Sequence, residues 1–75
     1  MKELLEKIAR SLVDNPDEVS VTEIYDEQSI ILELRVAEED MGKVIGKQGR
    51  IAKAIRVVMK ASAIKENKRV VVEII

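Results

Sequence analysis

The sequence predicts an α+β fold, a two-layer sandwich in which three helices cover a three-stranded mixed sheet. The expected elements follow the order α-β-β-α-α-β, and each expected strand has one mainly apolar face that helices must cover. The chain has 75 residues, of which 47% are apolar. It therefore fits one small domain with one core, residues 1–75.

The first half of the chain is expected to form a helix and a β-hairpin. Apolar residues recur at helical spacing over 2–13, until Asn15-Pro16, where proline pushes the preceding residue out of the helical conformation. A strand rich in β-branched residues follows at 18–25, and residues 26–29 are typical of a hairpin turn. Residues 30–36 alternate strictly, which predicts a second strand whose apolar face consists of Ile30, Leu32, Leu34 and Val36.

The second half is expected to form a helical pair and a final strand. Three acids, Glu38-Glu39-Asp40, open a short helix that runs through about Ile45. They are more typical of a first helical turn, where they complement the helix dipole, than of a metal site. A longer helix is expected over 50–64 and a strand over 70–75. Because two helices separate strands 30–36 and 70–75, these strands are expected to be parallel, with one sheet face left for solvent or a partner.

Helix 50–64 is expected to have a core face and a basic face. The core face should consist of Ile51, Ile55, Val58, Met59 and Ser62. Four bases lie within about 120° of one another, namely Arg50, Lys53, Arg56 and Lys60. Val57, Ala61 and Ile64 lie among these bases. They are either scattered exposed apolar residues, which are common, or a dimer seam at which the small Ala61 permits close helix approach.

Composition excludes several kinds of chemistry. The chain has no Cys and no His, so disulfides, Cys/His zinc sites, thiol nucleophiles and imidazole acid-base catalysis are ruled out. No apolar run approaches the roughly 18 residues of a membrane span, and the N-terminus lacks the apolar core of a secretory signal. We therefore expect a cytoplasmic protein with no membrane partner, no metal and no cofactor.

The formal net charge of -1 hides a strong asymmetry along the chain. Read alone, it argues against a nucleic-acid binder, because such proteins are usually basic. Residues 1–41 carry four bases and twelve acids, whereas residues 42–69 carry nine bases and one acid. A chain of this kind can present a basic surface to a polyanion while its total charge stays near zero. The alternative is that helix 50–64 has a solvated basic face and nothing more.

The most informative segment is Gly46-Lys47-Gln48-Gly49, a break between the two expected helices. Glycine adopts positive φ angles and has no side chain to hold a phosphate away. The following amides lie at a helix N-terminus, which favours an anion, and Lys47 and Arg50 add formal charge. The loop thus suits a phosphodiester backbone, although G-x-x-G also occurs as a tight helix-helix turn. Two other phosphate motifs do not fit: the spacing from Gly42 departs from a P-loop, and the dinucleotide fingerprint G-x-G-x-x-G is absent.

The loop and its context resemble the KH RNA-binding domain. Val44-Ile45-Gly46-Lys47-Gln48-Gly49 is similar to the core of the family signature V-I-G-x-x-G-x-x-I, and the element order resembles the type II arrangement. The resemblance covers the whole chain and is most specific in residues 11–16 and 40–55. One position departs from the signature, because Ala52 stands where its last isoleucine is expected and Ile51 comes one position earlier.

The resemblance implies that single-stranded RNA crosses a groove between the two core helices and the central strand. The G-x-x-G loop of this family clamps about four nucleotides. Bases would rest on aliphatic side chains, with Ile31 or Leu34 as a further floor; the one aromatic residue, Tyr25, is expected to pack in a strand rather than to stack bases. The implied RNA-binding residues are Val44, Ile45, Gly46, Lys47, Gln48, Gly49, Arg50, Ile51 and Lys53, with Arg56 and Lys60 as weaker candidates.

The resemblance to small bacterial proteins made of one KH domain also implies partners. Such proteins form homodimers and pair with a larger protein that joins a KH domain to a second nucleic-acid-binding domain. The leading hypothesis is a non-catalytic single-stranded RNA-binding protein, acting as a post-transcriptional regulator or RNA chaperone. The alternative is an assembly module whose main ligand is a protein, with RNA contact secondary. An enzyme is disfavoured, because no general base or metal set converges on the loop.

Overall fold

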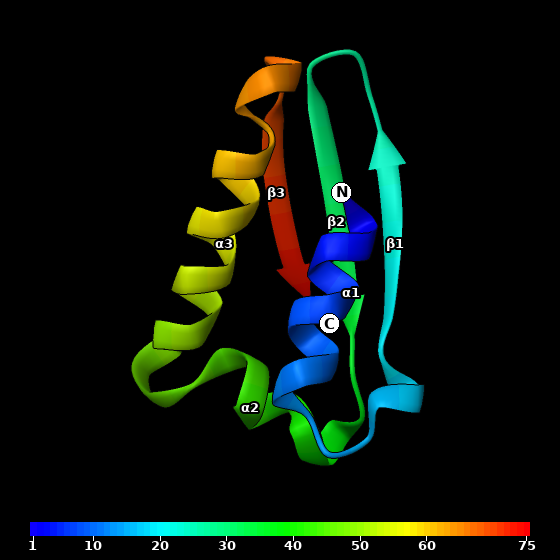
Figure 1. Ribbon diagram of the computed structural model, residues 1–75, viewed down its shortest axis with the longest axis vertical. Helices are drawn as coiled ribbons and strands as arrows, with labels where there is room; N and C mark the ends of the chain where they lie inside the picture. Colours follow the sequence, from blue (N-terminus) through cyan, green and yellow to red (C-terminus); the bar gives the residue numbers. More distant parts are fainter.

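A three-stranded sheet forms one layer of the computed structural model, shown in Figure 1. The structure describes residues 1–75, except for the side chain of Lys65. The strands are β1 (Ser20–Tyr25), β2 (Ser29–Arg35) and β3 (Arg69–Ile74). Strand β2 is central, antiparallel to β1 and parallel to β3. The predicted mixed sheet is therefore confirmed, including the parallel pair on either side of the helical crossover.

The helices α1 (Lys2–Leu12) and α3 (Arg50–Ser62) lie on the same face of the sheet, and the short helix α2 (Met41–Ile45) lies below them (Figure 1). The predicted order and the two-layer α+β class are confirmed. The first strand begins two residues later than expected because residues 16–18 form a 3₁₀ turn, and α3 ends two residues earlier because residues 64–66 form another. Across the residues that the structure describes, no helix has the length and apolar character needed to cross a membrane.

The core lies between the helices and the inward face of the sheet. Alternate residues of β2 point into it, and Ile30, Leu32 and Leu34 have no exposed surface, as the strict alternation predicts. Helix α1 adds Leu5 and Ala9, which are also fully buried. The opposite face of the sheet has no helix over it, so the expectation that one face stays open is confirmed for the chain described.

The core face of α3 differs from the prediction. Ile55 and Met59 are buried as expected, but Val58 is 43% exposed and Ser62 is exposed. Their places in the core are taken by Ala52 and Ala63, so the helix is rotated by roughly 60° from the expected orientation. Ala52 lies within α3 and Ala63 follows its last residue, so small side chains occupy these core positions.

The N-terminus of α1 is held by a carboxylate from strand β1. The Glu23 Oε2 atom accepts a hydrogen bond from the Lys2 backbone N–H at 3.1 Å and another from the Tyr25 hydroxyl at 3.0 Å. The terminal amino group of Met1 lies 3.9 Å from the same oxygen. Glu23 thus satisfies an amide that the helix itself leaves unpaired and places a negative charge at the positive end of the helix dipole.

Candidate nucleic-acid interface

The loop between α2 and α3 is held in a tight conformation by its own backbone. The Gly46 N–H donates to the Gly42 carbonyl at 2.8 Å and ends α2, and the Gly49 N–H donates to the Gly46 carbonyl at 3.1 Å. Gly46 and Gly49 have φ angles of 76° and 75°. The sequence prediction that the two glycines provide positive φ angles is therefore confirmed, and residues 47–49 form a single 3₁₀ turn before α3 begins at Arg50.

Gln48 also has a positive φ, of 59°, although it is not a glycine. A left-handed conformation is unfavourable for residues with a Cβ, because the Cβ approaches the following carbonyl oxygen. Three of the four loop residues therefore have positive φ angles. The sequence gives no signal for strain at Gln48, because glutamine is not a residue that commonly marks this conformation.

Positive charge gathers where the loop joins α3. Lys47, Arg50 and Lys53 are exposed, and the first turn of α3 contains no acidic residue. The Arg50 N–H donates to the Lys47 carbonyl within the preceding turn, and the loop lies at the positive end of the α3 dipole. Lys47, Gln48 and Arg50 are thus exposed around a helix N-terminus, which is an arrangement suited to phosphate oxygens.

The apolar residues flanking the loop differ in accessibility. Ile45 is 37% exposed and Ile51 is partly buried, so both present aliphatic surface beside the loop. Val44 has no exposed surface and packs in the core, so it offers no surface to a base in this structure. Leu34 is also fully buried. Ile31 lies on the sheet face opposite the helices, away from the loop.

The groove beside α3 is lined by the edge strand rather than by the predicted central strand. Helix residues Arg56 and Lys60 form one wall, and residues 69–72 of β3 form the other, around a hollow of about 250 Å³. The Arg56 Nε–H donates to the Val72 carbonyl at 3.3 Å. The central strand β2 cannot line this groove, because its inward side chains are covered by α1 and α3 and its edge is covered by β3.

A second hollow, of about 370 Å³, separates α3 from α1. Its lining is apolar apart from Arg50 and includes Ile8, Leu12, Ile51 and Val58. The two grooves on either side of α3 therefore differ in character. The groove toward β3 carries Arg56, Lys60 and Arg69 and suits an anionic chain, whereas the groove toward α1 is aliphatic.

Some basic residues of the positively charged segment 42–69 already interact with other residues of the chain. The Lys43 ammonium forms an ion pair with Asp14 and lies 3.5 Å from an oxygen of Asp40. Hydrogen bonding to Asp14 raises the pKa of Lys43 above its usual range, despite its partial desolvation. The Lys68 ammonium lies over the Tyr25 ring, 5.5 Å from its centre. Tyr25 is 55% exposed, so it packs against Lys68 rather than in the core. Lys43 is therefore less available to a ligand than the exposed bases Lys47, Arg50 and Lys53.

Only one of the three acids that open the second half is buried. Asp40 is fully buried, whereas Glu38 and Glu39 are exposed, and no group of three metal-ligating side chains occurs in the part of the chain that the structure describes. Burial raises the pKa of Asp40, but hydrogen bonds from Asn15 and from the Asp14 amide, with the Lys43 charge, outweigh it and lower that pKa overall. The sequence does not reveal this buried carboxylate, because its partners lie 25 and 26 residues away.

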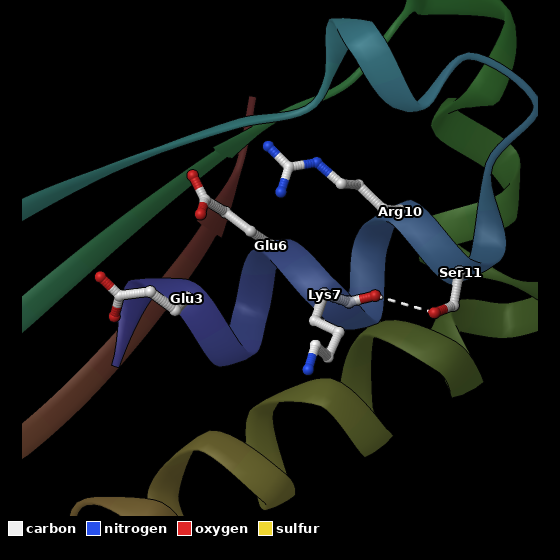
Figure 2. Close-up of a pocket in the computed structure, with 5 residues that line it drawn as sticks. All are labelled: Glu3, Glu6, Lys7, Arg10 and Ser11. Carbon is white, nitrogen blue, oxygen red and sulfur yellow. Dashed lines mark hydrogen bonds between the residues drawn. The ribbon is translucent and has the colours of Figure 1, made fainter.

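The charged outer face of α1 does not form a second site. Figure 2 shows Lys7 directed toward α3, whereas Glu6 and Arg10 point to the other side of the helix. The Ser11 hydroxyl donates to the Lys7 carbonyl at 2.8 Å within the helix. Lys7 therefore lies on the opposite side of α1 from Glu6 and Arg10, so these side chains do not gather around one ligand.

The predicted dimer seam lies on the side of α3 that faces away from the sheet. Val57 is 67% exposed, and Ile64, in the turn after the helix, is 76% exposed. Ala61 is exposed between them. The three residues form a small apolar strip beside Arg56 and Lys60, accessible to a partner.

A three-stranded mixed sheet, helices on one face and a G-x-x-G loop between the second and third helices define a KH domain of the α-β-β-α-α-β type. Residues 2–74 match the family described as KhpA/KhpB, KH domain, and the chain belongs to this family.

Curated relatives match over their full length. The chain is 80% identical to the "RNA-binding protein KhpA" of Clostridium acetobutylicum and 75% identical to that of Clostridium perfringens. It is 69% identical to the protein of the same name from Caldanaerobacter subterraneus subsp. tengcongensis. In all three comparisons, 100% of this chain and 100% of the relative are covered. No solved structure gives a significant match. The family is not an enzymatic one, in agreement with the sequence prediction.

Proposed function

We propose that the chain is a non-catalytic single-stranded RNA-binding protein that acts in the bacterial cytoplasm as a post-transcriptional regulator or RNA chaperone. The names of its curated relatives, RNA-binding protein KhpA, support the ligand class. The observation that carries the proposal is the loop 46–49, where a strained glycine-rich backbone, a helix N-terminus and exposed bases meet at one place.

The loop would hold the phosphate backbone, and neighbouring aliphatic surface would hold the bases. Phosphate oxygens would lie at the positive end of the α3 dipole, while Lys47 and Arg50 supply charge. Ile45 and Ile51 give aliphatic contact to the first bases. From the loop the RNA would follow the groove between α3 and β3, because Arg56, Lys60 and Arg69 line that groove.

Binding of this kind has a defined salt dependence. A protein that neutralises Z phosphates of a single strand shows a slope of about -0.7Z in a plot of log affinity against log salt concentration. We expect the double variant Lys47→Asp/Gln48→Asp to lose at least about tenfold in affinity for a single-stranded RNA of about eight nucleotides, and its slope to be shallower than that of the wild type.

A matched control separates the loop from the total charge. Lys7→Asp/Ser11→Asp makes the same change in formal charge on α1, outside the loop, where both residues are exposed. It should keep nearly the wild-type affinity, with folding of every variant checked by circular dichroism. The proposal fails if the two double variants bind equally well, or if the wild type shows no salt-dependent binding.

A second function, assembly with another KH protein, is favoured by the strip Val57, Ala61 and Ile64. These apolar residues lie on the face of α3 turned away from the core. We propose that the strip forms a homodimer seam, and that it also accepts a KhpB-like partner, since the family description joins both proteins. One KH domain contacts few nucleotides, so a dimer would raise the overall affinity for RNA by linking two loops.

A further inference from the structure

A single buried carboxylate joins the turn after α1 to the start of α2, the helix that carries the G-x-x-G loop. We propose that Asp40 is a positioning residue for RNA binding: it fixes α2, and through α2 the loop 46–49, in the conformation that receives RNA. This inference rests on the proposed function and adds to it a residue that never touches the ligand.

Asp40 is bound from two directions. Its Oδ2 atom accepts hydrogen bonds from the Asn15 backbone N–H and from the Asn15 side-chain amide, both at 3.0 Å, and its Oδ1 atom accepts one from the Asp14 N–H at 3.3 Å. On the other side, the Lys43 ammonium lies 3.5 Å from Oδ1. The side chain has no exposed surface, so these contacts replace water completely.

The contacts of Asp40 matter to the loop because α2 is too short to be stable by itself. It has five residues, little more than one turn, and a helix of that length has no stability without tertiary contacts. Asp40 fixes the N-terminal end of α2, and Val44 packs in the core. The hydrogen bond from the Gly46 N–H to the Gly42 carbonyl fixes the C-terminal end. The position of Gly46 therefore follows from the position of α2, which Asp40 links to the end of α1.

Asp40→Asn keeps the size of the side chain but loses the charge and replaces one acceptor oxygen by an NH₂ group. That NH₂ group cannot accept from the Asn15 or Asp14 amides. We expect a larger share of molecules with α2 displaced, and apparent affinity falls in proportion to the share that remains competent. Kd for RNA should rise about five- to tenfold in conditions where the variant is still folded.

Asn15→Ala tests the same network without changing any charge. It removes the Asn15 side-chain amide, which lies outside the loop and donates to Asp40. It should raise the Kd for RNA about two- to threefold. This variant also keeps the proposal testable if Asp40→Asn does not fold.

The control is Glu23→Gln, which alters a partly buried carboxylate at the opposite end of α1. Glu23 also accepts a backbone N–H, but its partners are Lys2, Tyr25 and Met1, and none belongs to α2 or the loop. If Asp40 affected RNA binding only through overall stability, Glu23→Gln and Asp40→Asn would change the Kd for RNA in the same way. We expect Glu23→Gln to lower the unfolding midpoint while Kd for RNA stays at the wild-type value.

The experiment measures two quantities for the full chain. The first is Kd for a single-stranded RNA oligonucleotide at a temperature where all variants are folded. The second is hydrogen exchange of the Gly46 and Gly49 amides without RNA, which should speed up in Asp40→Asn and Asn15→Ala but not in Glu23→Gln. Unchanged loop exchange in Asp40→Asn, or equal losses of affinity in Asp40→Asn and Glu23→Gln, would overturn the proposal. If the wild type itself binds no RNA, the proposed function fails, while the exchange measurement still decides whether Asp40 fixes the loop.

Discussion

The side chain of Ile51 lies directly against the Cα of Gly46. A Cβ added at Gly46 would lie 2.6 Å from the Ile51 Cγ1 atom and 2.9 Å from its Cβ, closer than such atoms approach. Ile51 therefore closes the loop from the α3 side, and Gly46 is required for space as well as for its φ of 76°. The departure from the KH signature at Ala52 is explained in the same way: Ala52 packs in the core, while Ile51 packs on the loop.

The three glycines near the loop should respond differently to alanine. Gly46→Ala should cost more than about 2 kcal/mol of unfolding free energy, because it combines a positive φ with overpacking against Ile51. Gly49→Ala should cost about 1 kcal/mol, because only its φ is unfavourable and nothing lies within 4 Å of the added Cβ.

Gly42→Ala is the control for that series, since Gly42 lies in α2 with free space around it. It should stabilise the protein by about 0.5–1 kcal/mol, because alanine favours a helix more than glycine does. Urea denaturation measures all three. Equal losses for Gly46→Ala and Gly49→Ala would show that Ile51 does not restrict position 46.

Gln48→Gly should stabilise the protein by up to about 1 kcal/mol. Relief of the left-handed conformation at Gln48 outweighs the greater freedom of glycine in the unfolded chain. Gln28→Gly, in the β1–β2 turn where φ is not positive, should instead lower the unfolding free energy by about 0.5 kcal/mol. Urea midpoints that fall for both variants would mean that Gln48 is not strained.

Acid should remove the contribution of Asp40. Its pKa is lowered in the folded protein, so the ionised carboxylate stabilises the fold at neutral pH, and this stabilisation is lost as the pH falls through the folded-state pKa. The difference in unfolding free energy between wild type and Asp40→Asn should be largest near pH 7 and shrink toward about pH 3. Chemical denaturation across this range gives the comparison, and a difference that stays constant with pH would contradict the assignment.

The proposed dimer seam on α3 can be tested through the oligomeric state of the protein. Ala61→Glu places a charge among Val57 and Ile64 and should convert a dimer to a monomer in sedimentation velocity. Ser62→Glu adds the same charge one residue further round the helix, on an exposed side chain outside the seam, and should leave the dimer intact. The seam is disproved if Ala61→Glu sediments like the wild type.

The order of elements, the strand pairing and the loop could all be predicted from local pattern. Alternation in β2 and the G-x-x-G break are encoded by neighbouring residues, so the sheet and the positive φ angles at Gly46 and Gly49 came out as expected. Rotation of α3 could not be predicted, because Ala52 and Ala63 give a weaker apolar signal than Val58, although they are the residues that are buried. The burial of Val44 could not be predicted either, because it depends on contacts with residues far along the chain.

Long-range polar contacts could not be predicted from the sequence either. Glu23 holds the N-terminus of α1 from 21 residues away, and Asp40 holds the turn at Asn15 from 25 residues away. Both residues resemble the exposed acids around them, such as Glu38 and Glu39. Only the folded chain distinguishes a carboxylate that accepts backbone amides from one that faces water.

The central claim is that loop 46–49 and the first turn of α3 contact the RNA backbone. The most direct measurement is a titration of isotope-labelled protein with a single-stranded RNA oligonucleotide, followed through backbone amide chemical shifts. We predict that the largest changes occur at Lys47, Gln48, Gly49, Arg50 and Ile51, followed by residues along the groove between α3 and β3. Largest changes on the open face of the sheet or on the outer face of α1, with the loop unaffected, would contradict this account.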